Sequence, residues 1–238
     1  MICFLTSRTD NPDTGELNPA NRLITELRIH FPSPCRALDI CSNPDGWEQQ
    51  DYYAALTKST FEKAGFSFDQ FLSLDSRNEN MAAELVRKSN LLILSGGHVP
   101  TQNRFFEKIR LRELMKDYNG IVIGISAGSM NSADIVYSQP EEEGEAIDPA
   151  YQRFLTGLNL TKTNLIPHYQ EDKDDVLDGL RIYEDIAYPD SMGKAFYAIP
   201  DGSYLFINDH REELRGEAYL IKDGLITQVS SLNDVISL

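Results

Sequence analysis

The residues with the clearest chemical character lie in the run IVIGISAGS at 121–129. An apolar, β-branched stretch leads to Ser126, which lies between Gly124 and Gly128, and small, helix-compatible residues follow. This is a G-x-S-x-G pattern in the order strand, sharp turn, helix that a nucleophilic serine requires. Because glycine has no Cβ, neighbouring backbone can pack close around the turn. The pattern predicts that Ser126 is a nucleophile; the alternative is a glycine-rich turn with an ordinary serine.

A serine is a weak nucleophile near neutral pH, so it needs a general base, and the base needs an orienting group. Of the four histidines, His30 ends an amphipathic helix and His210 lies in a charged turn, so both are expected at the surface. His168 follows a short apolar strand, which places it at the same sheet edge as Ser126. The sequence therefore favours His168 as the base; the alternative is a hydrogen-bonded structural histidine.

A second glycine-bearing strand end lies one strand–helix unit earlier, where Gly96 and Gly97 follow the strand at 91–94. A Gly-Gly turn allows backbone N–H groups to point into a site, as an oxyanion hole requires. The N–H groups of Gly97 and Ala127 are the expected pair, and such donors each contribute a factor of about 100–1,000 in rate. His98 comes directly after this turn, so it is expected beside the oxyanion hole. The alternative is a plain loop.

The elements that must position these residues follow from the alternation of short apolar runs and helical stretches through the first 135 residues. Strands are expected at 1–6, 36–41, 66–72, 91–94 and 121–125, and helices at 19–31, 48–64, 80–89, 101–117 and 127–135. Short continuous apolar strands are typical of a parallel sheet covered on both faces. Such alternation predicts right-handed βαβ units, in which ligands bind beyond the carboxyl ends of the strands.

The last third of the chain changes character after a polar, acidic loop at 137–151. A helix is expected at 174–187 and short strands at 195–199, 203–208, 217–222 and 225–229. Asp223 and Gly224 separate the last two strands and predict a tight hairpin. We expect these strands to extend one edge of the sheet in antiparallel fashion, so that residues 1–238 form a single α/β domain.

Composition excludes several classes of function. Hydrophobic residues make up 41% and charged residues 25% of 238, as in an ordinary soluble globular protein. The net charge of −15 repels phosphate backbones and anionic membranes, so neither nucleic acid nor membrane is an expected partner. Residues 1–6 lack the basic start of a signal peptide. Three cysteines without C-x-x-C spacing fit a reducing cytoplasm and argue against a thiolate metal site.

The order and spacing of these motifs resemble the peptidase E (aspartyl dipeptidase) and cyanophycinase family. The shared features are strand-Gly-Gly, strand-Gly-x-Ser-Ala-Gly-Ser, Pro-His and Ile-Pro-Asp-Gly, over about residues 91–207. The resemblance implies a serine peptidase without a cofactor. It also implies a three-layer α/β/α fold similar to flavodoxin and class I glutamine amidotransferases, with a mostly parallel central sheet. It assigns Ser126 as nucleophile, His168 as general base and Asp201 as the third triad member.

Two positions depart from the family pattern. Family members often carry Glu where this chain has Asp201, which is one methylene shorter. A second acid is implicated in the family about fifteen residues beyond the nucleophile, and Glu141 occupies that place within the run 141–143. The alternative for Glu141 is a solvated loop charge.

His98 replaces the Asn, Asp or Gly that is common after Gly-Gly in the family. Contact of His98 with substrate is therefore expected, and the Asp-X dipeptide preference stays open.

An acidic substrate side chain would call for an arginine, because the guanidinium binds a carboxylate bidentately. Arg181 and Arg104 are the candidates, and surface positions are the alternative for both. The acidic clusters at 141–145 and 172–175 lack EF-hand spacing, and no His/Cys cluster has zinc spacing, so no metal is expected.

The leading hypothesis is a cytoplasmic serine peptidase that acts on short peptides as a monomer or homodimer. One alternative is an esterase of the α/β-hydrolase type, which shares G-x-S-x-G. That fold places the acid before the histidine in the chain, so His210 would have to be the base. The other alternative is a non-catalytic binding protein on an amidotransferase-like scaffold. A glutamine amidotransferase itself would carry Cys in place of Ser126.

Overall fold

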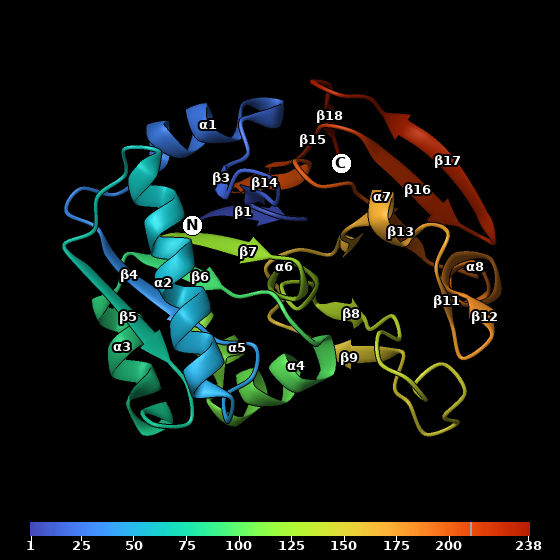
Figure 1. Cartoon of the computed structure of the whole chain (residues 1–238), viewed down its shortest axis with the longest axis horizontal. Helices are drawn as coiled ribbons and strands as arrows, with labels where there is room; N and C mark the ends of the chain where they lie inside the picture. The colour runs from blue at the N-terminus through green and yellow to red at the C-terminus, as the bar shows by residue number, and fades with distance from the viewer. Residues whose placement is uncertain (210) are drawn as a thin grey trace.

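A computed structural model describes residues 1–209 and 211–238 (Figure 1). Its centre is an eight-stranded sheet in the order β18-β15-β14-β1-β7-β6-β4-β5, in which β1, β7, β6, β4 and β5 are parallel. These strands are β1 (Ile2–Thr6), β4 (Arg36–Ile40), β5 (Gln70–Leu74), β6 (Leu91–Leu94), β7 (Ile121–Ile125), β14 (Tyr204–Asn208), β15 (Arg211–Arg215) and β18 (Val235–Ser237). The expected mostly parallel central sheet is confirmed.

Helices cover both faces of this sheet, because successive side chains of each strand point to opposite sides. On one face, Phe4, Leu91 and Ile93 pack with α1 (Leu23–His30) and α2 (Trp47–Lys63). On the other, Leu5, Leu92 and Val122 pack with α3, α4 and α5. The latter helices are α3 (Ala82–Lys88), α4 (Val99–Lys108) and α5 (Leu111–Met115). Short 3₁₀ turns, η1 (Ala20–Arg22) and η2 (Glu79–Met81), precede α1 and α3.

Three predicted elements of the first 135 residues have different bounds in the structure. The helix expected at 101–117 is two helices, because Arg110 between them has a left-handed φ of +54°. The helix expected at 127–135 ends early as α6 (Ala127–Met130), and the chain then enters strand β8 (Ile135–Tyr137). The strand expected at 66–72 begins at Gln70, because Phe66 and Phe68 instead pack against Phe31.

The C-terminal strands form two groups rather than one. β14 pairs antiparallel with β1, and β15 and β18 continue the central sheet, so the predicted antiparallel extension is confirmed. The strands at 195–199 and 217–229, however, join a separate sheet in the order β10-β13-β16-β17 (Figure 1). Its strands are β10 (Asn164–Ile166), β13 (Ala195–Ala198), β16 (Ala218–Lys222) and β17 (Leu225–Ser230).

This second sheet has a core of its own, which explains why its strands leave the central sheet. Phe196 of β13 stacks on Tyr137 with ring centroids 4.2 Å apart, and Ile186 packs in the same cluster. The predicted hairpin is confirmed: Asp223 and Gly224 join β16 to β17, and both have positive φ, as a tight two-residue hairpin turn requires.

The prediction of a helix at 174–187 is wrong for the first half of that segment. That half is a small hairpin of β11 (Val176–Leu177) and β12 (Leu180–Arg181), followed by a π-helix (η3, Ile182–Ala187) and α8 (Tyr188–Asp190). The hairpin turns at Asp178, whose φ is +54° and whose carboxylate accepts from the N–H groups of Gly144 and Ala146. The contact of Asp178 with the acidic loop thus stabilises a hairpin where a helix was expected.

The remaining elements are small. They are two more hairpins, β2 (Asp10–Asn11) with β3 (Glu16–Leu17) and β8 with β9 (Phe154–Thr156), and the short helix α7 (Tyr169–Asp172). In the described part of the chain, no helix has both the length and the apolar character needed to cross a bilayer. Cys3, Cys35 and Cys41 are buried and free.

Candidate active site

The carboxyl ends of β1, β6 and β7 lie side by side at one edge of the central sheet, and Ser126 follows β7 there (Figure 1). Ser126 has φ +49° and ψ −112°, a strained conformation for a residue with a side chain. Its N–H donates to the carbonyl oxygens of Thr6 and Ser7, both at 3.1 Å. Gly128 allows the turn to close, because a Cβ there would lie 2.1 Å from the oxygen of Leu94.

Three side chains from distant segments meet at this point. His168 Nε2 lies 3.0 Å from Ser126 Oγ, and His168 Nδ1 lies 2.8 Å from Asp201 Oδ1. His168 enters from the turn after β10 with a left-handed φ of +58°, and Asp201 from the turn between β13 and β14. This is the geometry in which a histidine can accept the proton of a serine while a carboxylate orients the ring.

Asp201 is held by more than His168. The hydroxyl of Ser7 donates to Oδ1 at 2.6 Å, and Arg8 Nη1 lies 3.5 Å from Oδ2. Burial raises the pKa of Asp201, but the hydrogen bonds from His168 and Ser7 outweigh it, so the pKa lies below its usual range. The shorter side chain of Asp at this position therefore still reaches His168 as a carboxylate.

The Gly96-Gly97 turn lies directly against Ser126. A Cβ on Gly96 would lie 3.4 Å from that of Ser126, and one on Gly97 would lie 2.3 Å from Ser42 Oγ. Gly97 has φ +145°, which favours glycine. In the described residues, the N–H groups of Gly97 and Ala127 donate to no protein acceptor. Both donors are therefore available beside the serine.

Replacing Gly97 with alanine should slow catalysis by about 100- to 1,000-fold, since the new Cβ displaces the turn and its N–H. The measurement is kcat on a short peptide, or the rate of covalent labelling by a fluorophosphonate. Gly65→Ala is the matched control: Gly65 also has a positive φ, of +88°, but nothing lies within 4 Å of its Cβ position. Equal rates in the wild type and the Gly97 variant would exclude this turn as the oxyanion hole.

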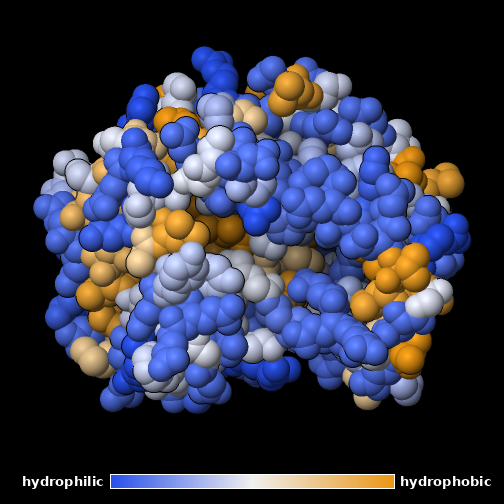
Figure 2. Space-filling model, viewed as in Figure 1, coloured by the Kyte–Doolittle hydropathy of each residue, from blue (hydrophilic) through white to orange (hydrophobic). Residues whose placement is uncertain are grey.

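The Ser126 side chain opens into a cleft of about 350 Å³. Ser95, Gly96 and Gly97 form part of its wall together with His168. Across the cleft, helix α2 and the segment after β1 supply the remaining lining residues, which are Arg8, Thr9, Asp10, Gln50, Tyr53, Leu56, Thr57 and Thr60. Figure 2 shows the surface hollowed near the end of β7, with hydrophobic atoms at depth and hydrophilic atoms around the rim.

The sequence matches the Peptidase family S51 over residues 4–215. The chain belongs to peptidase family S51. It is therefore an enzyme of the serine peptidase type. No curated protein sequence matches the chain.

Solved structures support the fold of this S51 peptidase. A peptidase from an acI-B1 Actinobacterium superimposes with a TM-score of 0.65 at 16% identity, covering 100% of this chain and 96% of that one. A putative peptidase E protein from Listeria monocytogenes superimposes with a TM-score of 0.59 at 15% identity, covering 96% of this chain and 98% of that one.

Two further residues predicted for the site, His98 and Glu141, both contact Glu145 of the acidic loop, and neither lines the cleft. His98 Nε2 lies 2.8 Å from Glu145 Oε1, and His98 Nδ1 lies 2.8 Å from Thr101 Oγ1. Glu141 is an exposed residue by its overall surface, but desolvation of its carboxyl group and the charge of Glu145 raise its pKa to about 8, and its N–H donates to Glu145. The carboxylate beside His168 is that of Asp201, so an accessory role for Glu141 and a substrate contact for His98 stay predictions.

The arginines suggested by the sequence lie apart from the cleft. Arg181 is exposed and forms a bidentate pair with Asp185, and Arg104 lines a small pocket of about 200 Å³ with Asn43 and Lys108. The cation that does line the cleft is Arg8. The sequence offered a signal for it, since Arg8 comes within two residues of the end of the first strand.

Two groups of side chains in the described residues are close enough to hold a metal ion. One is His168, Glu171 and Asp201, which is the candidate triad with one neighbouring acid. The other is His98, Glu142 and Glu145. In that group Glu145 already bonds to His98 with one oxygen and to two backbone N–H groups with the other. Both carboxylate oxygens of Glu145 are thus engaged in contacts within the protein.

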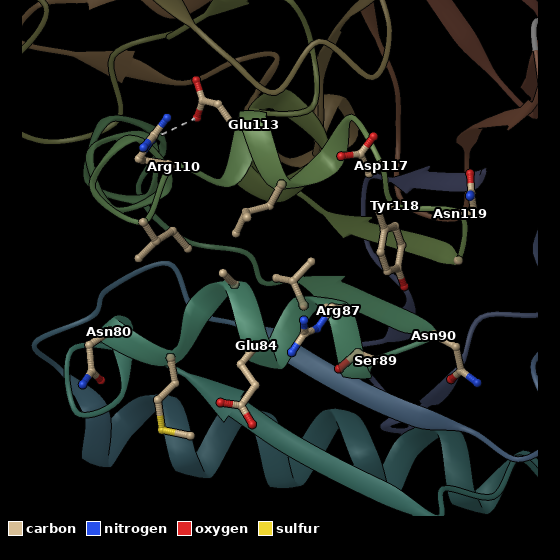
Figure 3. Close-up of a pocket in the computed structure, with 16 residues that line it drawn as sticks. Asn80, Glu84, Arg87, Ser89, Asn90, Arg110, Glu113, Asp117, Tyr118 and Asn119 are labelled. Carbon is tan, nitrogen blue, oxygen red and sulfur yellow. Dashed lines mark ion pairs between the residues drawn. The ribbon is translucent and has the colours of Figure 1, made fainter.

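A larger cavity, of about 1,070 Å³, lies elsewhere on the S51 peptidase, between α3 and the α4–α5 segment (Figure 3). Its lining includes the charged residues Glu84, Arg87 and Asp117, which Figure 3 labels, and apolar residues such as Val86 and Leu114. None of its lining residues belongs to the Ser126 cleft. Its lining contains no serine–histidine pair, unlike that of the smaller cleft.

Asp39 lies in β4 and contacts Ser95, which lines the Ser126 cleft. We expect the ionisation of Asp39 to make the stability of the protein depend on pH. Asp39 is 2% exposed, and burial raises its pKa to about 7, although the Ser95 hydroxyl donates to it at 2.9 Å. As pH rises from about 4 to about 7, Asp39 ionises in the unfolded chain but stays protonated in the folded chain. This difference lowers the free energy of unfolding across that pH range. Asp39→Asn should therefore stabilise the protein by about 2–4 kcal/mol at pH 8 and hardly at pH 4.

Urea unfolding at both pH values measures this effect. Asp75→Asn is the contrasting variant: Asp75 is equally buried but accepts hydrogen bonds from Arg77, so its loss should destabilise the protein. The same stability gain for Asp39→Asn at pH 4 and pH 8 would show that Asp39 does not titrate in this way.

Proposed function

We propose that this S51 peptidase hydrolyses peptide bonds of short peptides through Ser126, His168 and Asp201. The hydrogen-bonded chain from Ser126 Oγ through His168 to Asp201, at 3.0 and 2.8 Å, is the observation that carries the proposal. His168 takes the proton of Ser126 as Oγ attacks the scissile carbonyl carbon. Asp201 orients the ring and stabilises its charged form.

The rest of the reaction uses the same groups. The N–H groups of Gly97 and Ala127 stabilise the oxygen anion of the tetrahedral intermediate. His168 then gives its proton to the leaving amine, the C–N bond breaks, and an ester with Ser126 remains. A water molecule, deprotonated by His168, attacks this ester and releases the second product. No step calls for a cofactor.

The cleft supports a small, charged substrate. Its volume of about 350 Å³ lies at the lower end of the range for small-molecule sites. Arg8 and Asp10 line the cleft and pair with each other at 3.7 Å, so the two charged ends of a short zwitterionic peptide would compete for this ion pair. Asp-X dipeptides are the first class to test, because the family resemblance points to them.

The test combines a mechanism-based probe with a dipeptide screen. A fluorophosphonate should label the wild type on Ser126, and Asp-X dipeptides should be cleaved faster than matched Asn-X and Ala-X dipeptides. A folded wild type that neither reacts with probes of different size nor cleaves any dipeptide would favour the non-catalytic alternative. Cleavage without preference for Asp-X would retain the peptidase and remove the proposed substrate class.

The esterase alternative is less well supported by the geometry. It needs a histidine after the acid in the chain, and His210, the candidate for that role, lies outside the described residues. His168 meanwhile lies within hydrogen-bonding distance of both Ser126 and Asp201, with the acid after it in the chain. The order serine, histidine, acid therefore needs no other base.

A further inference from the structure

Ser7, the residue directly after β1, makes contact with all three members of the candidate triad. It is fully buried. Its hydroxyl donates to Asp201 Oδ1 at 2.6 Å and accepts from the backbone N–H of His168 at 2.9 Å. Its carbonyl oxygen accepts from the N–H of Ser126 at 3.1 Å. One residue thus links segments that lie 119, 161 and 194 positions away in the sequence.

We propose that Ser7 is a positioning residue of the catalytic machinery, acting through Asp201 and His168. This inference rests on the proposed function of Ser126. Ser7 does not line the cleft, whereas its neighbour Arg8 does, so Ser7 has no route to the substrate. Its effect on catalysis must therefore pass through the groups that it holds.

The need for such a residue follows from the competing contacts of Asp201. Oδ1 accepts from Ser7 and lies 2.8 Å from His168 Nδ1, whereas Oδ2 lies 3.5 Å from a guanidinium nitrogen of Arg8. A rotation of the carboxylate toward Arg8 would tighten that ion pair and weaken the contact with His168. The short hydrogen bond from Ser7 opposes the rotation, because hydrogen bonds to charged groups are stronger than those between neutral groups.

Ser7 also holds His168 from the backbone side. His168 has a left-handed φ of +58°, which is unfavourable for a residue with a Cβ. The Ser7 hydroxyl accepts its N–H and so stabilises this conformation, which directs the imidazole toward Ser126. A single hydroxyl therefore orients both the base and its carboxylate, donating to one and accepting from the other.

The rate of fluorophosphonate labelling measures this role without knowledge of the natural substrate. Ser7→Ala should lower the maximal labelling rate about 10- to 100-fold and leave the probe concentration for half-maximal rate unchanged. Ser7→Cys should behave like Ser7→Ala, since a thiol fills the space but is a weak donor. NMR should show the signal of the His168 Nδ1 proton lost or shifted upfield in both variants.

Ser191→Ala is the matched control. Ser191 is also fully buried, and its hydroxyl likewise donates once, to Tyr188, and accepts once, from the N–H of Gly224. Its loss should lower thermal stability but not the labelling rate. If Ser7→Ala fails to fold, Ser7→Cys carries the comparison, because it preserves the packing.

A double-mutant cycle decides whether Ser7 acts through Asp201. In an Asp201→Asn background, adding Ser7→Ala should slow labelling clearly less than it does in the wild type, since the carboxylate is gone and only the contact with the His168 N–H remains. The same 10- to 100-fold loss in both backgrounds would overturn the action through Asp201, and full activity of Ser7→Ala would overturn the positioning role as a whole. Labelling of the wild type that survives Ser126→Ala would instead overturn the proposed function itself.

Discussion

Replacing Ser126 with alanine should lower peptide hydrolysis by about 10⁴- to 10⁶-fold and abolish fluorophosphonate labelling, while the fold persists. The loss is large because the attacking oxygen is removed and only substrate binding and the oxyanion donors remain. The fold should persist because alanine removes a single oxygen atom from a half-buried site. The measurements are kcat on the best dipeptide and the thermal unfolding temperature.

Ser132→Ala is the control for this experiment. Ser132 lies shortly after the same turn and is fully buried, but its hydroxyl donates to the carbonyl oxygen of Gly128 within its own helical turn. Its replacement should leave kcat within a few-fold of the wild type. Substantial turnover by the Ser126 variant would mean that another group is the nucleophile.

His168→Ala should cause a loss of similar size, about 10⁴- to 10⁶-fold in kcat, because without a base Ser126 stays protonated. Ser126 and His168 act as one unit, so the double variant should be no less active than either single variant. Measured kcat values for the three proteins test this directly. Losses that multiply in the double variant would show that the two residues act independently.

His30→Ala provides the control for the histidine experiment. His30 ends α1, is half-buried and packs against Phe4 and Phe206 on one face of the central sheet. Its removal should lower stability without a matching loss in kcat. His210→Ala addresses the esterase alternative: a loss of activity in that variant, together with an active His168 variant, would favour His210 as the base.

Local sequence predicted the parts of this protein that depend on neighbouring residues. The run at 121–129 predicted strand, sharp turn and helix, and Ser126 has the strained backbone that such a turn implies. β1, β6 and β7 are buried along almost their whole length, as their short continuous apolar runs predicted. Asp223-Gly224 likewise predicted its hairpin, because the need for positive φ is a local property.

Sequence reasoning failed where distant contacts decide the outcome. The helix expected at 174–187 gave way to a hairpin whose Asp178 bonds to Gly144 and Ala146, more than thirty residues away. The strands at 195–199 and 217–229 form a second sheet because Phe196 packs on Tyr137 rather than on the central core. Such contacts have no signature in the local pattern, so propensity alone could not reveal them.

For the site, the sequence by itself determined which residue types were present and at which strand ends, and this was sufficient to select Ser126 and His168, whereas Asp201 was selected through the family resemblance. Only the tertiary structure decided that Asp201 reaches His168, that Arg8 lines the cleft and that Ser7 holds both partners. The physical reason is that hydrogen bonds act over about 3 Å. Which groups come that close depends on how β1, β7, β10 and β13 pack, not on their order in the chain.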